Sequence, residues 1–226
     1  ARFQEGPGVA LVQANFPTSV KHDPNERGKI FQAHYALTGK AVRKHHLDLV
    51  VWPETMYRDL WLKRSADISD DEWNHVFGLS FFSAVRVSRA GIPVLEKRGG
   101  GSIINISSIH GRVASPFKSA YVTAKHGLIG FTRTAALEGG AHGITANAIC
   151  PAFVSTPLVE NQIVDQARTH KLTREQVLEQ VMLAPAAIRR LITPEEVASL
   201  VVYLCSETAG AITGADWAID LGWTAR

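Results

Sequence analysis

Residues 101–125 constrain the fold of this chain more than any other part of its sequence. They begin with a short apolar run that predicts a strand, and two serines follow it directly. A loop with glycine and proline breakers comes next, and a helix then begins. Tyr121 and Lys125 lie one turn apart in that helix, so both side chains project from one face. The stretch therefore predicts a strand–loop–helix unit of an α/β protein.

Ser108, Tyr121 and Lys125 form a candidate set for proton transfer. Ser108 follows the predicted strand, so its hydroxyl can meet the phenol and the ammonium on the next helix. Because a nearby positive charge favours phenolate, Lys125 is expected to lower the pKa of Tyr121. Such a phenol is a general acid or base, and Ser108 can hold a carbonyl oxygen beside it. A Tyr and a Lys one turn apart are also common on ordinary helix surfaces, so the order of all three residues carries the prediction.

This ordered set resembles the short-chain dehydrogenases/reductases, which use Ser, Tyr and Lys in this order. Within that family, the segments SIHG, SPFKSAY and AICPAFVSTPLVENQ are similar to 3-hydroxybutyrate dehydrogenases. The resemblance covers residues 66–226 and implies a Rossmann-like three-layer α/β fold. It also implies that Tyr121 transfers the proton, that Ser108 orients the substrate oxygen, and that Lys125 tunes Tyr121 and holds the nicotinamide ribose.

The same resemblance implies residues that bind the substrate and the cofactor. The positions that match the carboxylate-binding residues of the hydroxybutyrate-specific members are His110, Lys118, Gln162 and Trp223. Cationic and amide donors suit a small carboxylate. The alternative is that His110 and Lys118 are surface residues of a loop and that Trp223 anchors the end of the chain at a subunit contact. The cofactor would be NAD or NADP, and its expected contacts are Lys125, Pro151, Ser155 and Thr156. Ser80 stands where the family often has an Asn.

The first part of the chain has a different resemblance. Two short apolar strands at 9–13 and 47–52, with a helix at 25–46 between them, predict a βαβ unit. The segments VALVQANFPTSVKHDPNERG and DLVVWPET resemble the nitrilase-like domain of apolipoprotein N-acyltransferases. That family's catalytic base maps to Glu54, but its Lys and Cys lie in segments that this chain lacks. Glu54 is therefore expected to be a polar residue at a strand end.

We interpret the chain as a hybrid within a single α/β domain, 1–226. A nitrilase-like segment would span 1–57, a seam 58–65, and a dehydrogenase-like segment 66–226. A dinucleotide site needs a glycine-rich turn after the first strand, so that backbone N–H groups can approach the pyrophosphate. The bulky sequence ANFP stands there instead, at 14–17. The hybrid is therefore predicted to bind a nicotinamide cofactor weakly or not at all.

The remaining elements are predicted from caps and apolar patterns. One helix is expected from Ser69 to about residue 97, and another from Thr193 to about residue 206. The helix that carries Tyr121 and Lys125 is expected to continue to about residue 141, with Leu137 facing inward. Two lid-like helices are expected within 157–182, and strands at 144–150 and 215–220. About five strands would then form a reduced parallel sheet in chain order, with right-handed crossovers. One face of this sheet would be short of helices, so a second subunit is expected to cover it in a homo-oligomer.

Composition narrows the class of protein. The chain has 226 residues, 46% of them hydrophobic, which suits one sizeable core. Its net charge of +3 is spread over the sequence without a basic stripe, which argues against nucleic-acid binding. Cys150 and Cys205 are expected to be free thiols in a reducing compartment. Neither a membrane-spanning run nor a metal-binding pattern is present, so a cytoplasmic protein with a small-molecule substrate is expected.

Three functions remain open from the residues. The first is an oxidoreductase of short-chain dehydrogenase type, acting on a small 3-hydroxy acid or alcohol. The second is a cofactor-independent esterase, in which Ser108 attacks the ester and Tyr121 with Lys125 serves as the base. The third is a catalytically inactive hybrid. Nicotinamide binding and turnover of a simple ester discriminate among the three.

Overall fold

The computed structural model describes residues 9–11, 49–51 and 63–225. These ranges include the strand–loop–helix unit of residues 101–125 and all the candidate residues for catalysis, substrate and cofactor in the dehydrogenase-like segment. The turn at 14–17, the helix expected at 25–46, Glu54 and most of the predicted seam lie outside the described residues.

Five described strands pair in parallel and follow one another in chain order. β3 (Gly101–Ile106), β4 (Ile144–Pro151) and β5 (Asp216–Ile219) form one sheet in the order β3-β4-β5. β1 (Val9–Leu11) pairs with β2 (Leu49–Val51). β2 contacts β3, although the paired ladders form two sheets rather than the single sheet that was predicted. Within each of the two sheets the strands follow the predicted chain order.

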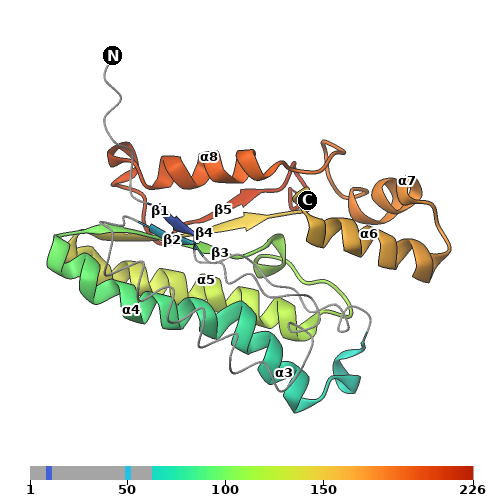
Figure 1. Ribbon diagram of the computed structural model, residues 1–226, viewed down its shortest axis with the longest axis horizontal. Helices are drawn as coiled ribbons and strands as arrows, with labels where there is room; N and C mark the ends of the chain where they lie inside the picture. The colour runs from blue at the N-terminus through green and yellow to red at the C-terminus, as the bar shows by residue number, and fades with distance from the viewer. Residues whose placement is uncertain (1–8, 12–48, 52–62, 226) are drawn as a thin grey trace.

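Helices cover this framework on two sides, which makes a three-layer Rossmann-like α/β fold. α4 (Ser83–Arg98) and α5 (Ser119–Gly139) lie below the strands in Figure 1, and α8 (Pro194–Leu204) lies above them. Ile104 and Ile149 pack against α8, while Ala146 packs against α5. Because both faces of the central strands are covered, most of their residues are apolar. Among the described helices, α8 alone lies along the upper face.

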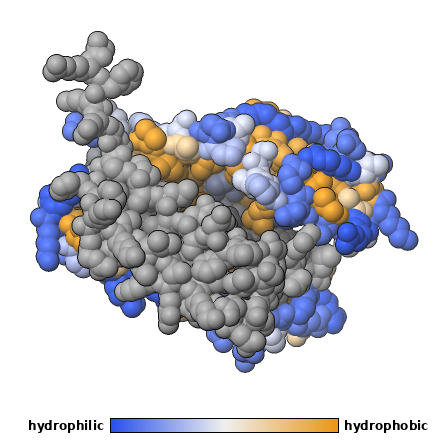
Figure 2. All heavy atoms as spheres, in the orientation of Figure 1, coloured by the Kyte–Doolittle hydropathy of each residue, from blue (hydrophilic) through white to orange (hydrophobic). Residues whose placement is uncertain are grey.

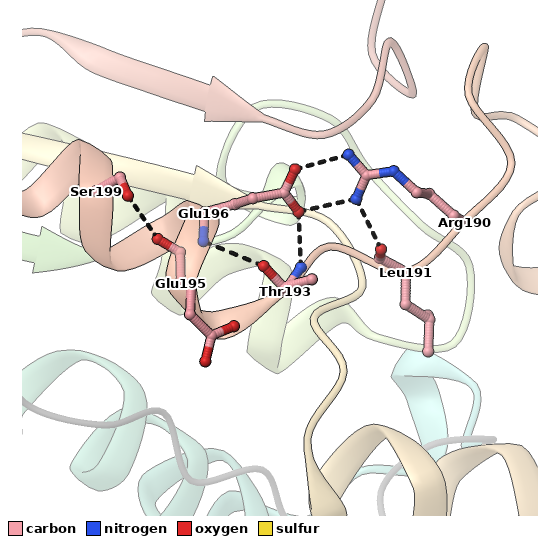
Figure 3. A network of polar contacts seen from close by, with 6 residues as sticks. All are labelled: Arg190, Leu191, Thr193, Glu195, Glu196 and Ser199. Carbon is pink, nitrogen blue, oxygen red and sulfur yellow. Dashed lines mark hydrogen bonds and ion pairs between the residues drawn. The ribbon is translucent and has the colours of Figure 1, made fainter.

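The cap signals in the sequence correctly locate two helix starts. Ser69 caps α3 (Asp70–Phe77) and Thr193 caps α8, each through a reciprocal bond pattern with a glutamate three residues later. In Figure 3, Glu196 accepts from the Thr193 N–H at 2.8 Å and from both terminal nitrogens of Arg190. The bonds from Arg190, followed by that from the Thr193 backbone, lower the pKa of Glu196 to about 2.

The helix expected from residue 69 to 97 is continuous but irregular. A π-helical segment, η4 (Gly78–Phe82), lies between α3 and α4. The Phe77 and Phe81 rings stack edge to face across it, with centroids 6.0 Å apart. The predicted inward position of Leu137 on α5 is wrong, because its side chain is 85% exposed. Leu137 lies two residues after the buried Ala135, about 200° around the helix.

The predicted lid consists of two helical pieces beyond the carboxyl ends of β4 and β5 (Figure 1). α6 (Pro157–His170) is followed by α7 (Arg174–Gln176), which continues into the π-helical η7 (Val177–Met182). Val159 and Ile163 pack against Val177 and Met182 in a separate apolar cluster. The lid therefore has its own small core next to the open ends of the strands.

Within the described ranges, no helix has both the length and the apolarity needed to span a bilayer. Neither cysteine forms a disulfide; Cys150 is buried and Cys205 half-buried. Figure 2 shows apolar residues at the surface on the α8 side, where Val202 is 53% and Tyr203 44% exposed.

Candidate active site

The two serines after β3 have different roles. The Ser107 N–H donates to the Ile149 carbonyl at 2.7 Å, which extends the pairing with β4 by one residue. Its hydroxyl donates to the Lys125 carbonyl at 3.1 Å. Ser107 thus ties the carboxyl end of β3 to β4 and α5. This structural role was not predicted from the sequence.

Ser108 begins the short 3₁₀ turn η5 (Ile109–Gly111). Its backbone is extended, and its buried hydroxyl oxygen accepts from the His110 N–H at 3.2 Å. A side chain at Gly111 would clash, because a Cβ there would lie 2.9 Å from both the Lys125 carbonyl oxygen and Ile129 Cδ1 on α5. The loop carrying Ser108 and His110 therefore packs closely onto α5.

Lys125 has an ammonium group in the protein interior. The residue is only 2% exposed, and its Nζ donates to the Ile106 carbonyl at 2.9 Å. The same Nζ lies 5.6 Å from the centroid of the Tyr121 ring. Burying an ammonium costs free energy unless it is well hydrogen-bonded. Its place at the end of β3 brings a positive charge to Tyr121.

His110 lies at the centre of a second group of predicted residues. Its ring meets the Tyr121 ring at 6.2 Å and the Trp223 ring at 6.0 Å, both nearly perpendicular. Its Nε2 lies 3.3 Å from the Nζ of Lys118. Burial first, and then the positive charges of Lys118 and His126, lower the pKa of His110 to about 3. His110 is therefore neutral at pH 7, and its Nε2 accepts a hydrogen bond from the ammonium.

Trp223 reaches His110 because the last turn of the chain is tied down by Asp220. One Asp220 oxygen accepts from the Gly222 N–H at 3.0 Å, and the other from the Thr224 N–H at 2.9 Å. Burial opposes ionisation of Asp220, but its bonds with Thr224 and Gly222 hold its pKa below the usual value. Sequence reasoning missed Asp220, since its partners are recognisable only once the turn is folded.

The remaining predicted residues lie on or next to the lid. Gln162 is a buried residue of α6, and Pro151 ends β4. The Ser155 N–H donates to the Ile192 carbonyl at 2.8 Å. The Thr156 hydroxyl oxygen caps α6 by accepting from the Val159 N–H at 3.4 Å. Ser155 and Thr156 therefore connect the lid to the open end of the sheet.

Tyr121 also belongs to an apolar cluster with aromatic side chains from the preceding helix. Phe77 and Phe81 pack with Tyr121 around the buried Val76 and Ala120. Ser80 lies inside η4, one residue before Phe81. The π-helical irregularity next to the Tyr121 helix was not predicted, because one extra residue in a helix leaves no cap or breaker in the sequence. In the described part of the chain, no group of three or more His, Cys, Asp or Glu side chains is placed to bind a metal ion.

A parallel α/β sheet, with Ser108 at a strand end and Tyr121 and Lys125 on the following helix, is the arrangement of a short-chain dehydrogenase/reductase. A family model described as "Enoyl-(Acyl carrier protein) reductase" matches residues 31–224. The chain belongs to this family. The match begins inside the segment interpreted as nitrilase-like, whose separate origin remains a prediction.

Individual relatives of this chain are also named as dehydrogenases. D-beta-hydroxybutyrate dehydrogenase of Rhizobium meliloti (strain 1021) is 48% identical over 166 residues, which cover 74% of this chain and 64% of the relative. The Cupriavidus necator protein of the same name is 41% identical over 160 residues, covering 71% and 62%. The chain thus spans slightly less than two thirds of the length of these curated relatives.

Comparison with solved structures agrees with the fold. L-sorbose reductase from Gluconobacter frateurii, solved in complex with NADPH and L-sorbose, has a TM-score of 0.74 at 26% identity. The similarity covers 84% of this chain and 72% of that chain. All three of these relatives are named as dehydrogenases or reductases, so the esterase alternative finds no support among them.

Proposed function

We propose that this chain is an oxidoreductase of short-chain dehydrogenase/reductase type that interconverts a small 3-hydroxy acid and its 3-oxo acid. One observation carries the proposal: the ammonium of Lys125 is buried 5.6 Å from the Tyr121 ring. The ring of His110, which is hydrogen-bonded to Lys118, meets the Tyr121 ring edge to face at 6.2 Å. A group for proton transfer thus has both a buried cation and the proposed carboxylate site as neighbours. The names of the two hydroxybutyrate-specific relatives support the choice of substrate.

Tyr121 is the proposed base for oxidation and acid for reduction. The field of the Lys125 ammonium stabilises phenolate, which takes the proton from the substrate hydroxyl as the C–O double bond forms. Ser108 holds the substrate oxygen, and its fixed place at the start of η5 keeps it oriented. A bound nicotinamide would supply the acceptor for the hydride that leaves the same carbon.

Lys118 and His110 are the proposed carboxylate site. A lysine ammonium carries three donors, and His110 Nε2 accepts from one of them. A charge-assisted bond to a carboxylate is roughly twice as strong as a neutral one. Because His110 is neutral, Lys118 supplies the positive charge of the site. The Trp223 ring packs edge to face against His110 and adds an apolar contact. Gln162 of the lid is proposed to add an amide donor.

The described residues fit the nicotinamide end of the cofactor. Lys125 presents a buried ammonium at the carboxyl end of β3; Pro151 is the last residue of β4, and Ser155 and Thr156 follow that strand. Ligands of open α/β sheets bind beyond these strand ends. These four residues are proposed to hold NAD or NADP there.

Cofactor affinity is expected to be low because the sequence after the first predicted strand reads ANFP and is not glycine-rich. A charge-assisted hydrogen bond is worth on the order of 1.5–3 kcal/mol, so losing two costs about 3–6 kcal/mol, or roughly two to four decades of affinity. Calorimetric titration with NAD and NADH measures this. A micromolar dissociation constant would show that the N-terminal unit provides a working pyrophosphate site.

Formation of NADH from D-3-hydroxybutyrate tests the proposed activity directly. We expect Tyr121→Phe to abolish turnover, since removing a general acid/base costs about 10²–10⁴-fold. Tyr203→Phe is the matched control, because Tyr203 lies on α8 and is 44% exposed. Turnover by the Tyr121→Phe protein at the wild-type rate would exclude the proposed mechanism. Hydrolysis of p-nitrophenyl butyrate that is lost in Ser108→Ala would favour the esterase instead.

A further inference from the structure

Arg112 directly follows the turn that carries Ser108 and His110. Its N–H and that of Val113 both donate to the Ile109 carbonyl, at 2.9 and 3.0 Å. The backbone of Arg112 is therefore part of the loop that presents the candidate site residues. An interaction that fixes the Arg112 side chain therefore also restrains this loop.

The Arg112 guanidinium is held by a carboxylate from a distant part of the chain. Its Nε lies 3.1 Å from Oδ2 of Asp216, the first residue of β5. The other oxygen of the same carboxylate accepts from Nη2 of Arg133, on α5, at 2.7 Å. The Asp216 side chain is only 17% exposed. One carboxylate thus joins the site loop, the last strand and the helix of Tyr121 and Lys125.

Asp216 is well placed to act as an anchor. Its backbone lies in the sheet opposite Ala148 of β4, so the carboxylate starts from a rigid element. Exposed ion pairs contribute little to stability, and Arg133 is 60% and Arg112 38% exposed. The pair is therefore expected to contribute more to the position of the loop than to the stability of the whole fold.

We propose that Asp216 is a positioning residue, which fixes the loop bearing Ser108 and His110 through its ion pair with Arg112. The assignment of an effect on turnover rests on the proposed function. Ser108 orients the reacting oxygen and His110 borders the carboxylate site, so a displaced loop weakens both substrate binding and catalysis. Reacting groups misplaced by about 1 Å can cost as much as 10²-fold in rate.

The chain offers a matched control. Arg133 binds the same carboxylate but lies on α5, outside the loop. We expect Asp216→Asn and Arg112→Leu each to lower kcat/KM for D-3-hydroxybutyrate about tenfold, with KM raised, whereas Arg133→Leu stays within about twofold of wild type. The double variant Asp216→Asn/Arg112→Leu should be no worse than Arg112→Leu alone, because both changes break the Arg112–Asp216 pair and the additional loss of the Arg133 bond is expected to have little effect.

Two readouts separate positioning from a general loss of structure. A smaller folded fraction lowers kcat and leaves KM unchanged, so a raised KM supports positioning. Arg112→Lys, which keeps the charge, should recover part of the lost kcat/KM. Equal effects of Arg112→Leu and Arg133→Leu, or a fall in kcat alone, would overturn the proposal.

Hydrogen exchange tests the loop without any activity. The amides of Gly111, Arg112 and Val113 should exchange faster in Asp216→Asn and Arg112→Leu, and at the wild-type rate in Arg133→Leu. Unchanged exchange in Asp216→Asn would overturn the positioning role. If the wild-type protein oxidises no D-3-hydroxybutyrate, the proposed function fails, but the exchange comparison still decides whether Asp216 holds the loop.

Discussion

The chemistry of His110 is set by its neighbours. Because burial and Lys118 lower its pKa from 6.5 to about 3, the unfolded chain binds more protons than the folded one between these values. Its contribution to stability is thus present above pH 6.5 and is lost as the pH falls toward 3. We expect Lys118→Met to raise the pKa of His110 but to leave it below 6.5, because burial is the larger cause. A histidine NMR titration measures this shift.

Lys97→Met is the control for that titration, since Lys97 lies in the last turn of α4 and should leave the His110 pKa unchanged. Lys118→Met should also raise the KM for D-3-hydroxybutyrate more than it lowers kcat. A His110 pKa that is identical in Lys118→Met and wild type would contradict the contact between these two side chains.

At the scale of elements, the capped start of α8 is a local feature that the sequence specifies completely. The Thr193 hydroxyl accepts from the Glu196 N–H at 3.2 Å. We expect Thr193→Ala to lower the free energy of unfolding by about 1 kcal/mol, or the Tm by about 2–4 °C. Thr134→Ala on the exposed side of α5 is the control, and should leave the Tm unchanged within a degree or so. A Tm for Thr193→Ala equal to that of Thr134→Ala would rule out the cap as a stabilising feature.

At the scale of the whole molecule, apolar side chains are exposed on the face of the sheet that α8 covers. Among the described helices, α8 alone lies along this face. We propose that a second copy of the chain covers this face, and we expect light scattering to find a dimer or larger assembly at micromolar concentration. Val202→Glu should shift the population toward the monomer. Val164→Glu on the lid is a matched control, because both valines are 53% exposed. A wild-type monomer at that concentration would contradict the proposal.

The sequence by itself determined the features that depend on neighbouring residues. The strand, loop and helix of residues 101–125 and the caps at Ser69 and Thr193 follow from local patterns, whereas the order of the parallel strands was predicted from the rule of right-handed crossovers. Hydrophobic periodicity and capping involve side chains within about one turn of each other, so they can be recognised without coordinates. The family resemblance of residues 66–226 rests on the same short segments.

Only the tertiary structure decided which side chains meet. It buries the ammonium of Lys125, brings Trp223 of the last turn to His110, and joins Asp216 of β5 to Arg112 of the site loop. It also exposes Leu137, which an apolar pattern alone placed inward. The physical reason is that burial and long-range ion pairs depend on how elements pack, and a pKa follows from the packing rather than from the residue type.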